Sequence, residues 1–211
     1  TGRVLRITAY ELRPDVSRNT RGVPVVNVMP LASGEKVKAV IGVRSLEDEN
    51  AYLLLSTRKG SIKRLALNAI SRIRPSGLII MNLKEDDALV AVRLAYEHDD
   101  AIIVTELGMS IRFPAVQVTP HSRTAGGMKG ITLRPRDRVV SMDVGNPETR
   151  LLVISKLGYG KLTQLNKYRT QRRGGVGIKT FNITKKTGNV AAAELVEDDK
   201  EVYVVSEQAN V

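Results

Sequence analysis

Apolar residues along the chain gather in short runs, and four of these runs end alike. They read "AYLLLST", "DAIIVTE", "RLLVISK" and "EVYVVSE", and their closing hydroxyl residues are Thr57, Thr105, Ser155 and Ser206. The spacings between these residues are 48, 50 and 51. Self-similarity at a fixed period near fifty residues predicts a repeat architecture.

A glycine turn and a second run of mixed apolar and polar residues follow the first three runs. The segments are "RKGSIKRLAL", "ELGMSIRFPAV" and "KLGYGKLTQL", with Gly60, Gly108 and Gly158 in the turns. Two such runs joined by a short glycine turn predict a β-hairpin. The opening "TGRVLRITAY" matches a second run and places Gly2 in register, so the first repeat lacks its start.

Each repeat continues with a basic, glycine-bearing loop, a third short run and a last apolar run. The loops with their third runs are "SRNTRGVPVVNVM", "SRIRPSGLIIMNL", "HSRTAGGMKGITL" and "QRRGGVGIKTFNI". The last runs are "KVKAVIGV", "LVAVRLA", "VVSMDVG" and "VAAAELV". The sequence therefore predicts four short strands in about every fifty residues.

An all-β fold follows from this count, with four-stranded blades arranged radially as in a β-propeller or a close variant. The approximate repeats are 1–56, 57–104, 105–154 and 155–211, incomplete at both ends. An ordinary β-sandwich with accidental similarity is the alternative, and four copies in register argue against it.

Composition limits the possible partners. The chain of 211 residues is 42% hydrophobic, and 33 Lys and Arg against 22 Asp and Glu give a net charge of +11. A surplus of this size favours a polyanion, either nucleic acid or an acidic membrane surface. No apolar run approaches the roughly 18 residues of a spanning helix, and no segment resembles a signal peptide. The lack of cysteine fits a reducing compartment, so we expect a cytoplasmic protein. Aromatic residues are only 4%, which favours duplex DNA over single strands read by stacking.

Charge follows the repeat. Acidic clusters precede the first strand of a unit, around Asp48, Asp99, Glu148 and Asp198, whereas the basic loops carry Arg18, Arg72, Arg123 and Arg172. The two sets are offset by about half a period, so we expect the positive charge to form a stripe along one edge.

The fourth repeat is the most basic part of the chain. Residues 149–193 contain no Asp, Glu or His, so we expect nothing nearby to neutralise their cations. The ten cations are Arg150, Lys156, Lys161, Lys167, Arg169, Arg172, Arg173, Lys179, Lys185 and Lys186. In "QRRGGVG" (171–177) two arginines run into glycines. Arginine suits phosphate oxygens, and glycines allow main-chain N–H groups to form an anion-binding nest, so this loop is predicted to seat phosphates.

The heptapeptide "QRRGGVG" resembles the gyrase box of DNA gyrase A C-terminal domains, and "YRT" before it fits the approach to that motif. The segments "TRGVPVVNVMPL", "GMSIRFPA" and "LGYGKLTQLNKYRTQ" are also similar to this family, and the resemblance covers essentially the whole chain. It implies a β-pinwheel whose neighbouring blades share strands and whose basic outer rim wraps double-stranded DNA.

The resemblance also implies a larger enzyme, an ATP-dependent type IIA topoisomerase that introduces negative supercoils. The wrap would present a DNA segment to the cleavage core of the same polypeptide, with the B subunit in an A2B2 complex. ATP and Mg would be bound elsewhere, so no cofactor is expected in this chain. The family's box normally lies in the first blade, whereas here it is in the fourth visible repeat. We therefore expect a fragment of a larger disc.

Two alternatives stay open. One is the C-terminal domain of the topoisomerase IV protein that corresponds to gyrase A, which shares the fold but usually lacks a full box. The other is a protein-interaction propeller whose basic loops bind acidic peptides.

The inventory of chemical groups favours binding over catalysis. "GVGIKT" is not a P-loop, because Ile178 separates Gly177 from Lys179. His98 and His121 lack partners that would indicate a metal site or a triad, so neither a catalytic nor a metal site is expected. The predicted DNA-binding residues are Gln171, Arg172, Arg173, Gly174, Gly175, Val176, Gly177, Arg169, Lys179, Lys161, Lys167, Arg18, Arg21, Arg72, Arg74, Arg123 and Lys129. We expect them to contact the backbone of duplex DNA without reading its sequence.

Overall fold

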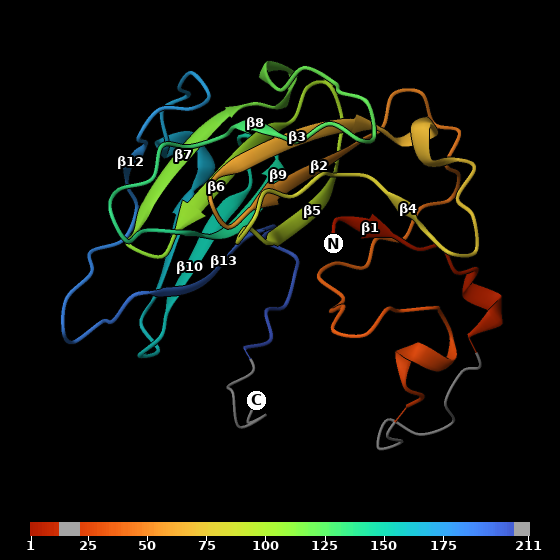
Figure 1. Cartoon of the computed structure of the whole chain (residues 1–211). Helices are drawn as coiled ribbons and strands as arrows, with labels where there is room; N and C mark the ends of the chain where they lie inside the picture. Colours follow the sequence, from red (N-terminus) through yellow and green to blue (C-terminus); the bar gives the residue numbers. More distant parts are fainter. Residues whose placement is uncertain (13–21, 205–211) are drawn as a thin grey trace.

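The structure, a computed structural model, describes residues 1–12 and 22–204 and is all-β (Figure 1). Its strands are β1 (Arg3–Val4), β2 (Tyr52–Thr57), β3 (Ser61–Ala66), β4 (Leu78–Ile79), β5 (Leu89–Ala95), β6 (Asp100–Thr105), β7 (Met109–Pro114), β8 (Met128–Lys129), β9 (Val139–Gly145), β10 (Arg150–Ser155), β11 (Gly160–Gln164), β12 (Ile178–Lys179) and β13 (Val190–Val196). Short 3-10 helices are η1 (Ala9–Glu11), η2 (Val25–Asn27), η3 (Leu67–Ile70), η4 (Ala115–Gln117) and η5 (Leu165–Lys167).

In the structure a repeat is counted from its apolar first strand, which begins at Tyr52, Asp100 or Arg150, about five residues before the approximate bounds given above. Each of the last three repeats, counted in this way, supplies four strands: β2 to β5, β6 to β9 and β10 to β13. The first two strands of each repeat form the predicted antiparallel hairpin, for example β2 with β3. The last strand of the repeat pairs with the other side of the first, as β5 does with β2. The fifty-residue period is therefore a structural period.

The third strand of a repeat pairs with the preceding repeat and not with its own. β4 pairs with β1, β8 with β3, and β12 with β7, all antiparallel. The resulting sheets have the orders β5-β2-β3-β8 and β12-β7-β6-β9. Neighbouring sheets are thus joined by shared strands, as the resemblance to a β-pinwheel implies.

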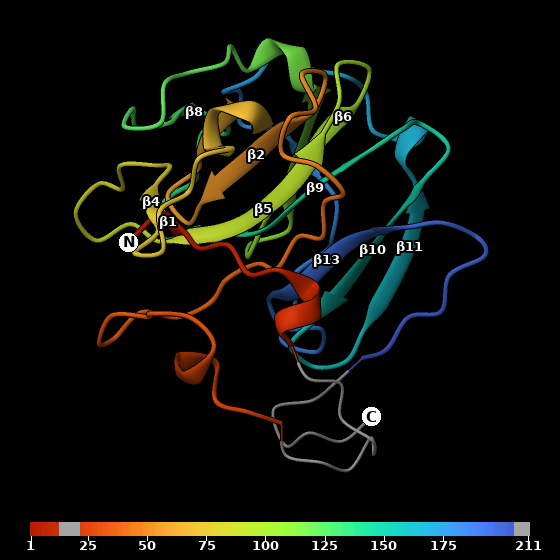
Figure 2. The ribbon, with the colours of Figure 1, turned by 90° about the vertical axis from the view of Figure 1, so that its right-hand side faces the viewer.

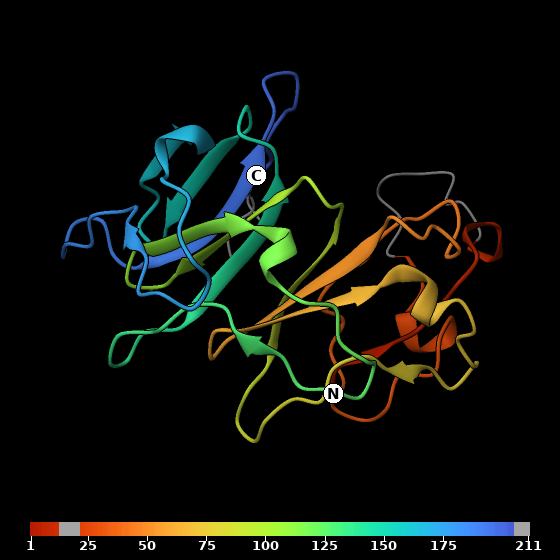
Figure 3. The same ribbon diagram turned by 90° about the horizontal axis from the view of Figure 1, so that it is seen from above.

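The exchanged strands lie on the outside of the assembly. β9 contacts both β5 and β13, so the last strands of the three repeats lie side by side on the inner side. The exchanged strands β8 and β12 are at the opposite edge of their sheets. Figures 2 and 3 show the sheet of β10, β11 and β13 set apart from the sheet that contains β2. Each sheet therefore has an inner edge and an outer edge.

The first repeat differs from the prediction. Its third run, "VPVVNVM", contains the 3-10 helix η2, and its last run, "KVKAVIGV", forms no strand. Among the described residues of this repeat, only β1 joins a sheet, a two-stranded one with β4. The valines of the third run are exposed, Val23 to 67% and Val26 to 60%, because no outer strand of a preceding repeat lies beside them in the described residues. The prediction that these two runs form strands is wrong for this repeat.

The last predicted strand lies partly outside the described residues. Residues 201–204, the start of the run "EVYVVSE", form no strand, and Ser206 lies outside the described residues. The described part of the chain therefore holds two four-stranded sheets, one three-stranded sheet and one two-stranded sheet.

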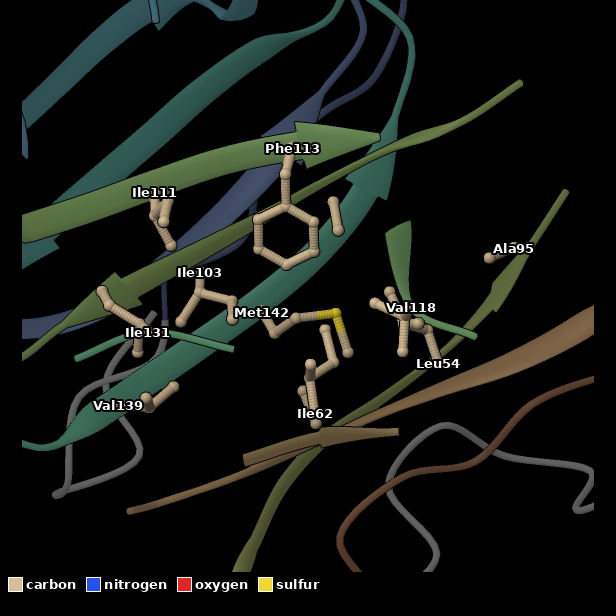
Figure 4. Close-up of a cluster of buried hydrophobic side chains, with 12 residues drawn as sticks. Leu54, Ile62, Ala95, Ile103, Ile111, Phe113, Val118, Ile131, Val139 and Met142 are labelled. Carbon is tan, nitrogen blue, oxygen red and sulfur yellow. The ribbon is translucent and has the colours of Figure 1, made fainter. Parts of the chain in front are cut away.

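The core fills the spaces between successive sheets, and the central strands β2 and β6 bury both of their faces. Leu54 packs toward the third repeat, whereas Leu53 and Leu55 pack toward the first. Figure 4 shows Leu54 and Ile62 of one sheet meeting Phe113 of the next. Burial on both faces explains why these strands read as unbroken apolar runs.

A buried lysine joins the second repeat to the loop of the third. Lys63 in β3 is 1% exposed, and its Nζ donates to the carbonyl oxygens of Ile80, Arg123 and Ala125, each at 2.7 Å. Burial lowers the pKa of Lys63 to about 8. Three carbonyl acceptors satisfy the three donors of the ammonium group, so this cation is structural and does not serve a ligand.

Two hairpin glycines differ in whether an exchanged strand lies beside them. Gly108 has φ of +77°, and the N–H groups of Thr180 and Phe181 both donate to its carbonyl oxygen. A Cβ on Gly108 would overlap the carbonyl oxygen of Phe181. Gly158 occupies the same position in the fourth repeat with φ of +81°, but nothing lies within 4 Å of a Cβ there.

We predict that Gly108→Ala lowers the free energy of unfolding by about 2 to 4 kcal/mol, because it adds a clash with the exchanged strand to the penalty of a positive φ. Gly158→Ala is the matched control and should lower it by about 1 kcal/mol through φ alone. Urea unfolding of both variants measures the difference. Equal losses would mean that the exchanged strand is not held at Gly108.

Candidate nucleic-acid interface

The basic loops run along the outer edges of the sheets. The loop 171–177 begins where the Gln171 N–H donates to the carbonyl oxygen of Arg112, at 2.8 Å. It ends where Ile178 pairs with Ser110 in the same strand, β7. The sequence "QRRGGVG" of the fourth repeat therefore covers the outer edge of the third.

Exposed cations follow these outer loops. Among residues 1–12 and 22–204, those that the sequence predicted to bind DNA and that are exposed without an ion-pair partner are Arg72, Arg74, Arg123, Lys129, Lys161, Lys167, Arg169, Arg172 and Lys179. Arg18 and Arg21, predicted in the same set, lie outside the described residues. The outer edge thus carries positive charge that the described acids leave unpaired.

Several acids are engaged away from these loops. Asp143 pairs with Arg93 at 2.8 Å, and Asp100 with the buried Arg112. Burial favours the neutral form of Glu106, but hydrogen bonds from Lys156 and Arg138 outweigh it and lower the pKa of this carboxyl. These carboxylates therefore already have cationic partners within the protein.

The interpretation that nothing neutralises the cations of the fourth repeat is wrong for two of them. Lys156 pairs with Glu106 at 2.7 Å, and Arg150 pairs with Asp198 at 2.9 Å. Both acids lie outside the acid-free segment in sequence. The pairing of β10 with β13 brings Asp198 near Arg150, and the fourth repeat reaches Glu106 where the Val190 N–H donates to the Glu106 carbonyl oxygen. The other cations of this repeat form no ion pair within the part of the chain that the structure describes.

The two adjacent arginines of the loop have different surroundings. Arg173 is partly buried, and its Nε and Nη1 donate to the carbonyl oxygens of Gln117 (3.2 Å) and Lys129 (2.6 Å). Its backbone N–H donates to Oε1 of Gln117 at 2.9 Å. Arg172 is exposed and makes none of these bonds. Arg173 fastens the loop to the preceding repeat, whereas Arg172 faces solvent.

The backbone of the loop is also bonded to the preceding repeat. The Gly174 N–H donates to the carbonyl oxygen of Gly130 at 2.8 Å. In return, the Thr132 N–H donates to the Gly175 carbonyl at 2.8 Å, and Thr132 Oγ1 donates to the Gly174 carbonyl at 2.7 Å. A Cβ on Gly177 would overlap the carbonyl oxygen of Ser110.

These contacts change the interpretation of the glycines. The N–H groups of Gln171, Arg173 and Gly174 already have protein acceptors, so they do not form the phosphate nest that the sequence suggested. The carbonyl groups of the preceding repeat provide acceptors at its outer edge, and the loop closes on them. Gly175 and Val176 are exposed beside Arg172. An open hollow of about 380 Å³ lies there, lined by Gln117, Arg172 and Arg173.

The segment before the loop is held by a buried arginine. Arg112 donates through Nε to Asp100 at 2.8 Å, and through Nη1 to the carbonyl oxygens of Leu165 (2.9 Å) and Tyr168 (3.0 Å). The Tyr168 hydroxyl lies 2.6 Å from Oγ1 of Thr180. Tyr168, in the "YRT" approach, is therefore a packing residue that fixes where the loop starts.

Sequence reasoning missed Gln117, Thr132 and Arg112, which hold the loop. Each belongs to the third repeat and lies about forty or more residues before its contacts in the fourth. No local pattern connects residues at that separation. The fifty-residue period is the signal that could have found them, provided that the loop of each repeat is placed on the sheet of the repeat before it.

Histidines, clusters of acids and long apolar helices would indicate other kinds of site. His98 and His121 are exposed. Within the described ranges, no three or more His, Asp or Glu side chains come together as a metal site would require. No helix in those ranges combines the length and apolar character needed to cross a membrane.

Comparison with known proteins identifies the repeats. The family described as DNA gyrase C-terminal domain, beta-propeller, matches residues 1–44, 51–95, 99–146 and 149–197. The DNA gyrase A protein of Staphylococcus aureus (strain NCTC 8325 / PS 47) is 42% identical over 207 residues. The same protein of strain MRSA252 is also 42% identical. The match covers 97% of this chain but 23% of each relative, so the chain spans about a quarter of their length.

Solved structures agree with the fold. A crystal structure of the C-terminal domain of DNA topoisomerase IV superposes with a TM-score of 0.86 at 24% identity, over 99% of this chain and 65% of that one. A structure of a DNA gyrase A C-terminal domain superposes with a TM-score of 0.78 at 25% identity, over 94% and 64% of the two chains. Both domains extend beyond the part that matches. The chain belongs to the family of DNA gyrase A C-terminal domains, which fold as a β-propeller of the pinwheel type.

Proposed function

We propose that this chain binds double-stranded DNA along its outer edge and bends it around the assembly of sheets. The observation that carries the proposal is the row of exposed, unpaired arginines and lysines on successive outer loops of the described residues. The likeness to gyrase A supports a DNA partner. The inner strands pack against one another, so the outer edge is the continuous surface on which a long ligand can lie.

Bending needs many contacts of moderate strength. Smooth bending of about 20 to 30 base pairs by roughly 40 to 90 degrees costs about 1 to 6 kcal/mol. Each phosphate that a cation neutralises releases counterions and adds a sequence-independent increment of affinity. Loops repeated about every fifty residues place such cations at intervals along the outer edge. Bound DNA can therefore bend along this edge from one repeat to the next. Base reading is not required.

Within the longer protein, the bent DNA would be presented to the cleavage core for strand passage. The core and the gyrase B subunit, with ATP and Mg, would supply the chemistry of ATP-dependent negative supercoiling. This chain would act as a non-catalytic domain of a type IIA topoisomerase. The identity to gyrase A and the presence of "QRRGGVG" support this assignment.

A second candidate is the C-terminal domain of topoisomerase IV. The superposition with a domain of that enzyme favours it, although a fold match at 24% identity does not separate the two enzymes. Both candidates bind DNA at the outer edge and differ in the activity of the complete enzyme.

We predict that Arg172→Ala weakens duplex binding for all sequences alike and makes the salt dependence of the binding constant less steep by about 1, since one phosphate contact is lost. Its thermal stability should not change, because the side chain is exposed. Arg150→Ala, which removes a cation already paired with Asp198, is the control and should keep the salt slope. A fluorescence anisotropy titration over salt measures both. An unchanged slope for Arg172→Ala would remove this residue from the interface.

Arg173→Ala should act differently. It removes the bonds to the carbonyl oxygens of Gln117 and Lys129, so we expect a loss of about 1 to 3 kcal/mol in unfolding free energy together with weaker DNA binding. Urea unfolding and the same titration measure the two effects. Full stability in this variant would contradict the role of Arg173 as a fastening residue.

In the complete enzyme, the double variant Arg172→Ala, Arg173→Ala should reduce supercoiling and spare relaxation, because only supercoiling requires the wrapped segment. Supercoiling and relaxation assays of the variant enzyme with the cognate B subunit measure both activities. Equal loss of both activities would argue against a wrapping role. A wild-type enzyme that relaxes or decatenates but never supercoils would favour the topoisomerase IV alternative.

A further inference from the structure

An arginine in the third repeat has a backbone conformation that arginine rarely adopts. Arg134 to Asp137 form a β-turn, closed by a hydrogen bond of 3.0 Å from the Asp137 N–H to the Arg134 carbonyl. Pro135 is the second residue of this turn. Arg136 is the third, with φ of +63°. Glycine or asparagine is strongly preferred at such a position.

The preceding repeats build the same turn with residues that tolerate this φ. Asp86 has φ of +58° in the turn 84–87, and Gly34 has φ of +79° in the turn 32–35. Aspartate and glycine are among the residues that enter the left-handed region most readily. The turn does not require an arginine, so its presence at Arg136 calls for a role of the side chain.

The turn follows closely in the chain after a residue that is bonded to the loop 171–177. Thr132 donates its N–H to the Gly175 carbonyl and its hydroxyl to the Gly174 carbonyl, so residue 132 touches the loop directly. Arg134 is two residues further along the chain and Arg136 four. Lys129, on the other side of Thr132, accepts the Arg173 bond through its carbonyl oxygen. Thr132 therefore joins the loop to the segment 129–136, which carries Lys129, Arg134 and Arg136.

The cations of this turn are free of protein partners in the described residues. Arg134 and Arg136 are exposed and belong to no ion pair. The adjacent Asp137 turns inward, where its carboxylate accepts from the Leu107 N–H (2.9 Å) and from Thr105 Oγ1 (2.7 Å). Arg138 is paired with Glu106 and is not part of this set. The equivalent turn of the second repeat reads Lys84-Glu85-Asp86-Asp87 and is net negative.

We propose that Arg134 and Arg136 are phosphate-binding residues and that, with Arg172 and Lys129, they form one duplex-backbone site shared by the third and fourth repeats. The ligand class is the sugar-phosphate backbone of double-stranded DNA. Strand exchange assembles the site, because the loop of one repeat lies on the outer edge of the repeat before it. The inference rests on the proposed DNA binding and adds to it a second row of contacts beside the loop.

Arg136→Gly separates a binding role from a structural role. Glycine suits the left-handed φ, so the melting temperature should stay the same or rise. Binding of a short duplex should weaken by about 5- to 10-fold at roughly 0.1 M salt, with a salt slope less steep by about 1. Arg134→Gln with Arg136→Gly should reduce the slope by about 2. Asp86→Gly, the same change in the equivalent turn, is the backbone-matched control and should not weaken binding.

Wild-type protein, the variants and the control are titrated with one duplex over a range of salt, and their melting temperatures are recorded. Unchanged affinity and slope in Arg136→Gly would overturn the proposal. Weaker binding with a lower melting temperature would also overturn it, because the residue would then act through the fold. If wild-type protein does not bind the duplex, the proposed function itself fails, and this outcome is distinct from the other two.

Discussion

Strand exchange between consecutive repeats is the interaction on which the rest of the structure depends. A repeat of about fifty residues is too short to bury both faces of its sheet, and each central strand here is apolar on both faces. The exchanged strands β8 and β12 join neighbouring sheets by main-chain hydrogen bonds at their outer edges. Because the basic loop directly precedes the exchanged strand, exchange also decides where the positive charge lies.

The loop 171–177 combines two roles within seven residues. Gln171, Arg173, Gly174 and Gly177 contact the preceding repeat through its backbone or through Gln117. Arg172, Gly175 and Val176 remain exposed. Fixing the backbone and one guanidinium lowers the entropy that the exposed arginine loses on binding, since its anchor is already rigid. A charged motif can thus owe most of its residues to the fold.

Periodicity in the sequence predicted the strands of three repeats and the glycine turns between them, because both are local properties of the chain. The family resemblance, and not the sequence pattern, implied which sheet the third strand joins, since the partners of β8 and β12 in the preceding repeat are 66 to 70 positions away. The run with Val23 and Val26 in the first repeat was predicted to form a strand. It does not, because the described residues contain no outer strand that it could join.

The site was predicted in outline and not in detail. Basic loops at fixed intervals are visible in sequence, but nothing local distinguishes Arg172, which faces solvent, from Arg173, which bonds to Gln117 and Lys129. Nor could sequence alone show that Glu106 neutralises Lys156, or that Arg136 adopts a positive φ. Each of these depends on which strands meet, so each required the three-dimensional structure.

The most direct test of DNA wrapping is the end-to-end distance of a bound duplex. A duplex of about 40 base pairs with a fluorescent donor at one end and an acceptor at the other is titrated with the chain at low salt. A path around the outer edge predicts that energy transfer rises as the complex forms and falls again as salt releases the DNA. Saturated binding with unchanged energy transfer would show that the DNA lies straight, and would contradict wrapping.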